Sequence, residues 1–118
     1  MNKKERILVV EDDRLIQNAI LRLCGDFNIE VLQAFDLKQA QELFLANQDV
    51  DGIIWDGKLP DGESPSLIEG IISKGYKGPM VANAGDPYVA EKQMKNGCTI
   101  YGGKRYSIKD LLKKMGLL

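Results

Sequence analysis

Charged side chains follow short apolar segments at three places in this chain of 118 residues. Glu11 and Asp12 come directly after the run RILVV, and Asp56 comes directly after VDGIIW. Lys104 follows the run TIY after two glycines. A charged side chain at the end of a buried strand costs free energy unless a partner group compensates it. We therefore expect these four residues to compensate one another at one site.

Three carboxylates and one ammonium group suit phosphoryl chemistry assisted by a divalent cation. If the strands before Asp12 and Asp56 are neighbours, they lie about 4.8 Å apart. The two charges then repel by roughly 3 kcal/mol at an effective dielectric constant of about 20. Magnesium relieves such repulsion, because it accepts incomplete all-oxygen sites and usually shares a phosphoryl group. A neighbouring aspartate can act as nucleophile and form an aspartyl phosphate, with Lys104 facing the phosphoryl oxygens.

Five apolar segments predict the strands that position these groups. They are Arg6–Val10, Ile29–Ala34, Val50–Trp55, Pro79–Ala82 and Thr99–Tyr101. Helical periodicity lies between and after them, and this alternation predicts a parallel sheet covered on both faces, in one α/β domain over residues 1–118. Sites in such sheets form beyond the carboxyl ends of the strands.

Apolar periodicity and capping residues predict five helices between and after the strands. The residues expected to begin the later four helices as N-caps are Asp36, Ser64, Asp86 and Ser107. The residues expected to face inward in the first helix are Leu15, Ile16, Ala19, Ile20, Leu23 and Cys24. In the fourth helix the inward residues are Val89, Ala90 and Met94.

Each candidate site residue also has a simpler explanation. Asp13, together with Asp12, can cap the first helix. Asp56 alone fits an exposed loop acid, and Lys104 alone fits a solvated surface lysine. The functional interpretation depends on their convergence at one sheet edge.

The composition excludes several other functions. Hydrophobic residues make up 44% and charged residues 28% of the chain, and the net charge of -1 gives no electrostatic case for nucleic acid as a partner. The chain has no histidine, which excludes Ser-His-Asp catalysis and histidine-ligated zinc. No apolar run approaches the roughly 20 residues of a membrane span, and the N-terminal run Ile7–Val10 is short for a signal peptide. We therefore expect a cytoplasmic protein without a membrane partner.

The motifs ILVVEDD, IIWDGKLP and GGKRY, in this order and spacing, resemble the receiver domain of two-component response regulators. The resemblance covers essentially the whole chain and implies a flavodoxin-like, doubly wound α/β fold with five parallel strands in the order 2-1-3-4-5 and five helices. It implies that Asp56 is the phosphoacceptor and that Lys104 contacts the phosphate. It also implies that Glu11, Asp12, Asp56 and the backbone carbonyl of Lys58 bind Mg²⁺.

The chain departs from this family where a receiver domain reports its phosphorylation. Ala84 stands at the place of the usual Thr or Ser after the fourth strand, and we expect the adjacent Asn83 to point the other way. Arg105 replaces a proline that normally follows the lysine in a cis bond. A cis bond before another residue costs about 3 kcal/mol, so we expect a trans bond and a rearranged loop. Tyr101 falls where the family has its rotating aromatic residue. These features predict that the chain still accepts a phosphoryl group, and that the conformational change by which the family reports phosphorylation is altered.

Three further residues near the predicted phosphoacceptor are informative. Ser64 replaces a glycine that is usual in the loop after Asp56. Lys58 and Asp86 occupy family positions that flank the phosphoryl entrance. We hypothesise that these two side chains approach each other, exclude water and slow dephosphorylation.

The leading interpretation is a stand-alone receiver without an output domain, signalling by protein contacts rather than acting as an enzyme. The resemblance implies a sensor histidine kinase or phosphotransfer protein as phosphodonor, a downstream protein partner, and a homodimer through the face of the fourth helix, fifth strand and fifth helix. The alternative is a pseudo-receiver, an interaction module that acts without phosphorylation. A small phosphohydrolase with an aspartate nucleophile is a third class. This chain lacks the second acid that such an enzyme would have two residues after Asp56, because Lys58 stands there. A flavodoxin-like nucleotide-binding protein is a fourth, but neither Gly-rich phosphate motif is present.

Overall fold

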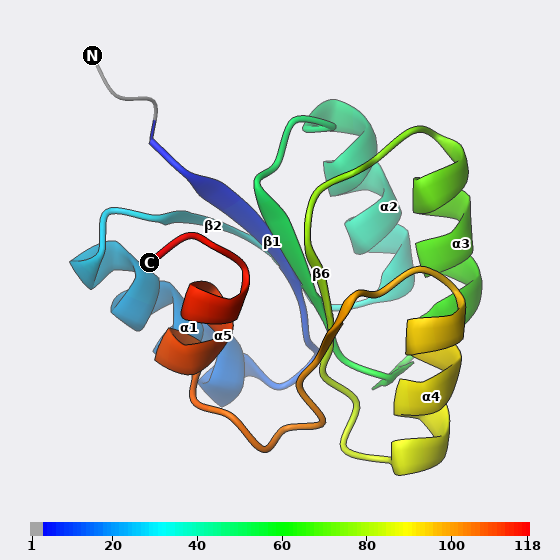
Figure 1. Ribbon diagram of the computed structural model, residues 1–118. Coiled ribbons are helices and arrows are strands. Elements are labelled where there is room, and N and C mark those ends of the chain that lie inside the picture. The colour runs from blue at the N-terminus through cyan, green and yellow to red at the C-terminus, as the bar shows by residue number, and fades with distance from the viewer. Residues whose placement is uncertain (1–3) are drawn as a thin grey trace.

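A parallel five-stranded sheet lies at the centre of the molecule (Figure 1). The computed structural model describes residues 4–118, so residues 1–3 of the predicted domain 1–118 lie outside the described part. The strands lie in the order β2-β1-β3-β6-β7, which confirms the predicted order 2-1-3-4-5, since β6 and β7 are the fourth and fifth strands of this sheet. The strands are β2 (Glu30–Ala34), β1 (Arg6–Val10), β3 (Gly52–Trp55), β6 (Met80–Ala82) and β7 (Ile100–Tyr101).

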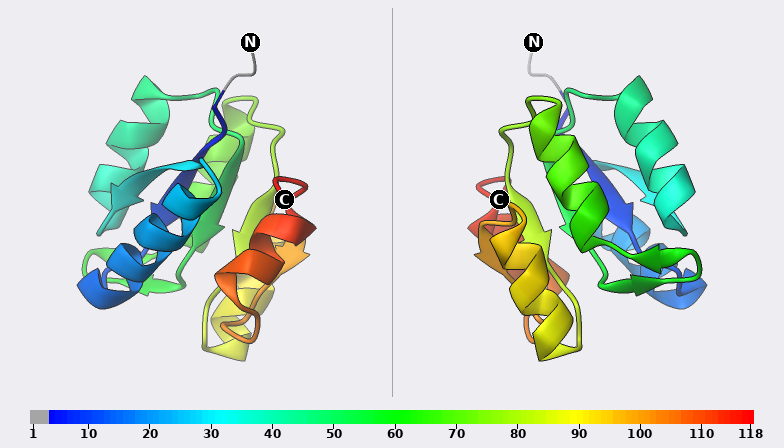
Figure 2. Two further views of the ribbon diagram at one scale, coloured as in Figure 1. Left: turned by 90° about the vertical axis from the view of Figure 1, so that its left-hand side faces the viewer. Right: turned by 90° about the vertical axis from the view of Figure 1, so that its right-hand side faces the viewer.

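Five helices cover the two faces of the sheet, as predicted. They are α1 (Arg14–Asp26), α2 (Leu37–Ala46), α3 (Pro65–Ser73), α4 (Pro87–Lys95) and α5 (Ile108–Lys114). Figures 1 and 2 show α1 and α5 on one face and α2, α3 and α4 on the other. Within residues 4–118, no helix is long and apolar enough to cross a membrane.

The register of the central strands brings the predicted site residues to one edge. Val10, the last residue of β1, pairs with Ala34 on one side and with Trp55 on the other. The amide N–H of Glu11 donates to the carbonyl of Ala34, and that of Asp56 donates to the carbonyl of Val10, both at 2.9 Å. The two acids therefore leave neighbouring strands at the same level of the sheet.

Apolar residues on the two faces of the sheet form the two largest core clusters. One lies under α2, α3 and α4 and contains Trp55, whose Nε1 lies 3.2 Å from the sulfur of Met80. The other lies under α1 and α5 and contains Ile7 and Ile54. Strands β1 and β3 are buried along almost their whole length, as expected for the interior of a doubly wound sheet.

The predicted N-caps are confirmed with one exception. Asp36, Asp86 and Ser107 each accept a hydrogen bond from a backbone N–H in the first turn of their helix, and Asp13 does the same at the start of α1. Ser64 precedes α3, but its hydroxyl makes no capping hydrogen bond. The helix therefore begins at Ser64-Pro65 as predicted, but the serine hydroxyl is buried and bound to Gln93 instead of a backbone N–H of α3.

The predicted inner face of α1 was also partly wrong. Leu15 is 82% exposed and Ile16 is 38% exposed, whereas Gln17 is fully buried together with Ile20 and Cys24. The Nε2 group of Gln17 donates to the carbonyls of Val9, Glu11 and Ala34, at 2.9, 3.1 and 2.9 Å. Val9 and Ala34 belong to β1 and β2 and Glu11 follows β1, so this one amide binds the carboxyl ends of two neighbouring strands and finds hydrogen-bond partners in the interior.

The chain after Asp56 forms a small antiparallel hairpin that the sequence did not predict. Its strands are β4 (Lys58–Leu59) and β5 (Gly62–Glu63). The hairpin projects from the carboxyl edge of the sheet and carries Lys58 to the site described below.

Candidate functional site

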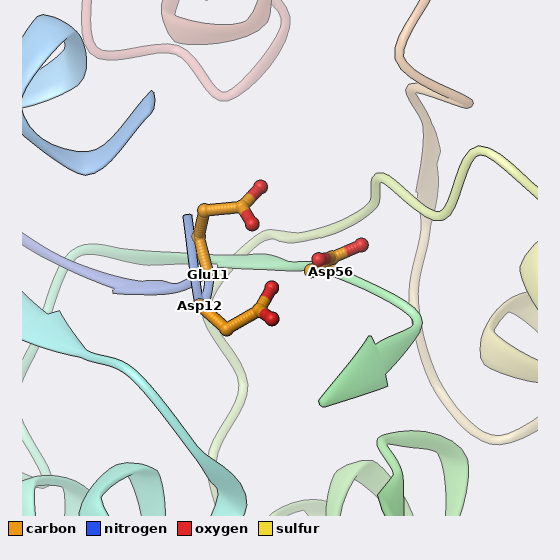
Figure 3. A group of neighbouring side chains, drawn as sticks. All are labelled: Glu11, Asp12 and Asp56. Atoms are coloured by element: carbon orange, nitrogen blue, oxygen red, sulfur yellow. The ribbon is translucent and has the colours of Figure 1, made fainter. Parts of the chain in front are cut away.

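Three carboxylates meet at the carboxyl edge of the sheet. Glu11 and Asp12 follow β1, Asp56 follows β3, and one carboxylate oxygen from each lies within 4.8 Å of the others. Figure 3 shows Glu11 and Asp12 one above the other, with both side chains extended toward the end of β3 that carries Asp56. The structure therefore brings together the three acids that the sequence singled out.

Lys104 supplies the positive charge of this cluster. Its Nζ lies 3.4 Å from Oδ1 of Asp56 and 3.6 Å from Oε1 of Glu11. Asp56 Oδ1 also accepts a hydrogen bond of 2.7 Å from the backbone N–H of Gly57. One ammonium group thus pairs with two of the three neighbouring acids, and the cluster has an excess of negative charge.

The electrostatics of the cluster favour binding of a further cation. Burial raises the pKa of Glu11 to about 7, and the negative charge of Asp56 adds to this effect against the opposing N–H of Asp13 and the charge of Lys104. Burial of Lys104 acts to lower its pKa, but the carboxylates of Asp56 and Glu11 outweigh it, so the pKa of Lys104 is raised. The lysine therefore remains charged while one acid holds its proton near neutral pH.

The donor set fits Mg²⁺, the metal that the resemblance implies. All the candidate ligands are hard carboxylate oxygens, and a carboxylate whose pKa is raised by burial and like charge gains from a divalent cation. Glu11, Asp12 and Asp56 would hold the ion. Lys58 lines the same site, and the role of its carbonyl as a ligand stays a prediction.

The raised pKa of Glu11 predicts a loss of stability of the metal-free protein between about pH 4.5 and about pH 7. In this interval the folded protein keeps a proton on Glu11 that the unfolded chain has released, so the free energy of unfolding falls as pH rises. The difference in pKa limits the effect to about 3 kcal/mol. Mg²⁺ replaces that proton, so it should raise the thermal unfolding midpoint more at about pH 8 than at about pH 5. An equal rise at both pH values, or an unchanged pH dependence in Glu11→Gln, would contradict this explanation.

A cavity of about 240 Å³ opens beside the carboxylate of Asp56. Its walls include Gly57, Ala84, Gly85 and Lys104. A Cβ atom on Gly57 would lie only 2.5 Å from the Cβ of Ala84, so a larger residue at either position would displace this wall. The cavity is polar on the side of Asp56 and Lys104, and its volume suits a group the size of a phosphoryl.

Lys58 and Asp86 approach each other at this cavity, as hypothesised. Lys58 Nζ lies 3.3 Å from Oδ2 of Asp86, and both residues line the cavity. The N–H of Tyr88 and the charge of Lys58 hold the pKa of Asp86 below its usual range. The ion pair connects the hairpin β4–β5 to the N-cap residue of α4.

The loop that carries Lys104 has the trans bond expected before Arg105. Gly103 and Lys104 both have a φ of 57°, and the hydroxyl of Tyr101 lies over Gly103, where a Cβ atom would be 2.5 Å away. The left-handed backbone conformation and this close contact both favour glycine at position 103. Tyr101, the predicted switch residue, is 38% exposed.

Asn83 holds this loop, a role that the sequence analysis missed. Its Oδ1 accepts a hydrogen bond of 2.9 Å from the backbone N–H of Lys104, the residue with the strained left-handed conformation. Trp55 pairs with Ala82, so the next residues, Asp56 and Asn83, are neighbours at the ends of β3 and β6. Ala84 lines the cavity and Asn83 does not, but the hydrogen bond from the Lys104 N–H to Asn83 fixes the position of the Lys104 backbone.

Two buried glutamines were missed for a common reason. Gln17 in α1 and Gln93 in α4 occupy inward positions where the sequence analysis expected apolar residues. The spacing Gln17–Ile20–Cys24 and the spacing Val89–Ala90–Gln93 both continue a buried helical face. A polar residue in phase with a buried face was the available signal, since it must find hydrogen-bond partners in the interior.

A second, wider hollow of about 510 Å³ lies between α2 and α3 but lacks comparable chemistry. Its acid, Asp61, already accepts the backbone N–H groups of Leu37 and Lys38 at 2.8 and 3.0 Å, and these bonds lower the pKa of Asp61. Asp61 therefore acts as an anchor for the start of α2.

The fold and the site together define a doubly wound α/β domain with an acidic edge and an opposing lysine. No protein-family model and no curated protein matches the chain. Among solved structures, the non-phosphorylated HemR receiver domain from Leptospira biflexa is similar at a TM-score of 0.82 and 24% identity, covering 96% of this chain and 92% of that one. A CheY-like response regulator receiver domain protein from Methanospirillum hungatei is similar at 0.79 and 26%, covering 97% and 92%.

A response regulator from Burkholderia pseudomallei also matches, at a TM-score of 0.84 and 20% identity, covering 94% of this chain and 66% of that one. The structure of that protein contains a phosphorylated aspartic acid, a calcium ion and citrate. The chain therefore has the fold of response-regulator receiver domains, and the resemblance drawn from its motifs is confirmed. Receiver domains are signalling modules rather than typical enzymes.

Proposed function

We propose that this protein accepts a phosphoryl group on Asp56 in a Mg²⁺-dependent reaction and signals through protein contacts. The observation that carries the proposal is the position of Lys104, whose ammonium group lies 3.4 Å from Asp56 at an edge shared with Glu11 and Asp12. A solvated lysine and an isolated loop acid would not be held together in this way. The phosphorylated aspartic acid and bound divalent cation of the Burkholderia pseudomallei protein provide support by analogy.

In the proposed reaction, a carboxylate oxygen of Asp56 attacks the phosphorus atom of a phosphohistidine or a small acyl phosphate. The new bond joins oxygen to phosphorus, and the bond from phosphorus to the leaving nitrogen or oxygen breaks with its electron pair. The leaving group takes up a proton from solvent or remains as a carboxylate. Bound Mg²⁺ would neutralise the charge of the phosphoryl oxygens. Lys104 would turn from Asp56 toward those oxygens and stabilise the charge that remains.

The proposed partners follow from the fold class. A sensor histidine kinase or a phosphotransfer protein would supply the phosphoryl group in the cytoplasm, and a downstream protein would bind the phosphorylated form. The face of α4, β7 and α5 is the proposed surface for that partner or for a homodimer. This proposal treats residues 1–118 as one receiver domain.

The decisive experiment is exposure of the protein to Mg²⁺ and acetyl phosphate, followed by intact-mass spectrometry. We expect one added phosphoryl group per chain and none when EDTA removes the metal. Absence of the adduct with both acetyl phosphate and a phosphorylated histidine protein would favour the pseudo-receiver instead.

Loss of the Lys58–Asp86 ion pair should shorten the life of the phosphoryl group. Lys58→Ala removes the cation that spans the cavity without removing Asp86, which also caps α4. We expect dephosphorylation to accelerate by up to about fivefold, because the pair is exposed and such pairs have modest effects. The measurement is the decay of the adduct after removal of the phosphodonor.

Lys92→Ala is the matched control for this variant. Lys92 also joins the hairpin to α4, through a pair of 3.7 Å with Glu63, but it does not line the cavity. Equal acceleration in both variants would show that the hairpin, rather than the Lys58–Asp86 pair, controls water access.

A further inference from the structure

The side-chain amide of Gln93 connects α4 to the backbone around Asp56. Gln93 is fully buried, and its Nε2 group donates to the carbonyls of Trp55 and Asp56 at 3.2 and 3.1 Å and to the hydroxyl of Ser64 at 2.9 Å. Its Oε1 accepts the N–H of Ala84 at 3.3 Å. One side chain of α4 therefore contacts the end of β3, the start of α3 and the wall of the phosphoryl cavity.

Ser64 is the matching partner of this amide. The serine is fully buried, makes no capping hydrogen bond to α3, and offers its hydroxyl to Gln93. These two buried polar side chains thus form a hydrogen bond with each other in the interior. Among the described residues, Gln93 has no unpaired side-chain atom, whereas Gln17 has an unpaired Oε1.

We propose that Gln93, with Ser64, transmits the phosphorylation state of Asp56 to helix α4. This inference rests on the proposed function. The Asp56 carbonyl belongs to the residue that would carry the phosphoryl group, and Ala84 lines the cavity beside that residue, so a shift of either backbone group alters the hydrogen bonds of Gln93. A buried amide that separates from its partners loses hydrogen bonds that no water replaces. When the backbone at Asp56 or Ala84 shifts, the Gln93 amide and helix α4 therefore shift with it.

This route differs from the one that a hydroxyl at position 84 would provide. Ala84 has no hydrogen-bonding side chain, but its backbone N–H is bound to Gln93. The responding surface is then the outer face of α4, which presents Tyr88 at 68% exposure together with Lys92 and Lys95. We assign Gln93 as a positioning residue rather than a group that touches the phosphoryl.

Beryllium fluoride with Mg²⁺, a phosphoryl analogue that adds to a carboxylate, tests the route by ¹H–¹⁵N NMR. In the wild-type protein we expect shifts of the amides of Asp56, Gly57 and Ala84, of residues 90–94, and of the Gln93 side-chain NH₂ group. In Gln93→Leu the shifts at Asp56 and Gly57 should persist, and those of residues 90–94 should fall at least about threefold.

Asn96→Ala, at the C-cap of the same helix, is the matched control. Asn96 also donates its side-chain amide to a backbone carbonyl, that of Pro65 at 2.9 Å, but it does not contact the site. We expect this variant to keep the response of residues 90–94. Loss of the response in both variants would show that α4 is merely loosened, and the proposal would then be rejected.

The outcomes separate this inference from the proposed function. No shift at Asp56 and Gly57 in the wild type would reject phosphoryl acceptance and the transmission with it. Shifts there without any in α4, or full α4 shifts in Gln93→Leu, would reject the transmission alone. If Gln93→Leu does not fold, Gln93→Met combined with Ser64→Ala removes both polar side chains with little change in volume, and the same two results decide.

Discussion

Replacement of Asp56 by Asn is expected to abolish the phosphoryl adduct and to leave the protein folded. An amide lacks the nucleophilic carboxylate oxygen, while its Oδ1 can still accept the N–H of Gly57. The substitution also removes one of three neighbouring acids. At an effective dielectric constant of about 20, two repulsions of roughly 3 kcal/mol each at about 5 Å are lost against one attraction to Lys104 of roughly 5 kcal/mol at 3.4 Å. We therefore expect the metal-free protein to gain about 1–3 kcal/mol of stability at about pH 8.

Intact-mass spectrometry after treatment with Mg²⁺ and acetyl phosphate measures the first effect, and urea unfolding measures the second. Asp13→Asn is the matched control, because Asp13 caps α1 and asparagine caps helices equally well. This control should keep both the adduct and the stability. An adduct in Asp56→Asn would mean that another residue is the phosphoacceptor.

Replacement of Lys104 by Met is expected to slow phosphorylation by about 100-fold to 1000-fold. This is the range for removal of one preorganised charge that stabilises a transition state. The variant also leaves Glu11 and Asp56 without the ammonium group that lies 3.6 and 3.4 Å away. The charge of Lys104 acts to lower the pKa of Glu11, so its loss should raise that pKa further above about 7. The variant should therefore be less stable than the wild type at about pH 8 and closer to it at about pH 5.

The rate is measured from the time course of the adduct with acetyl phosphate, and the stability from urea unfolding at both pH values. Arg105→Met is the control, since it removes the neighbouring cation from the same loop. In residues 4–118 the ion pairs of Glu11 and Asp56 are with Lys104, so Arg105→Met should have a small effect. Equal slowing in both variants would indicate that net charge near the site, rather than contact by Lys104, is responsible.

The sequence alone was sufficient for the fold and for the convergence of the acids. Apolar strands that alternate with amphipathic helices allow few arrangements other than a doubly wound parallel sheet. In that sheet the carboxyl ends of all strands lie at one edge, and the strand order implied by the family resemblance makes β1 and β3 neighbours, so Glu11, Asp12 and Asp56 were expected to meet there, as they do. Local rules also predicted the caps Asp36, Asp86 and Ser107, because a capping hydrogen bond spans only a few residues.

Only the tertiary structure decided where the polar interior residues lie. Gln17, Ser64 and Gln93 are buried because their partners are backbone groups, or each other, from segments far apart in the chain. Asn83 likewise fixes the backbone of Lys104 through a hydrogen bond between residues that are 21 positions apart in the sequence. Helical periodicity predicts a buried face from hydrophobic residues alone. It cannot predict that a polar side chain is buried when its hydrogen-bond partners are carbonyls at the end of a strand far away in the sequence. For that reason the sequence determined the charges of this site, and the packing of helices on the sheet decided how they are held and connected to α4.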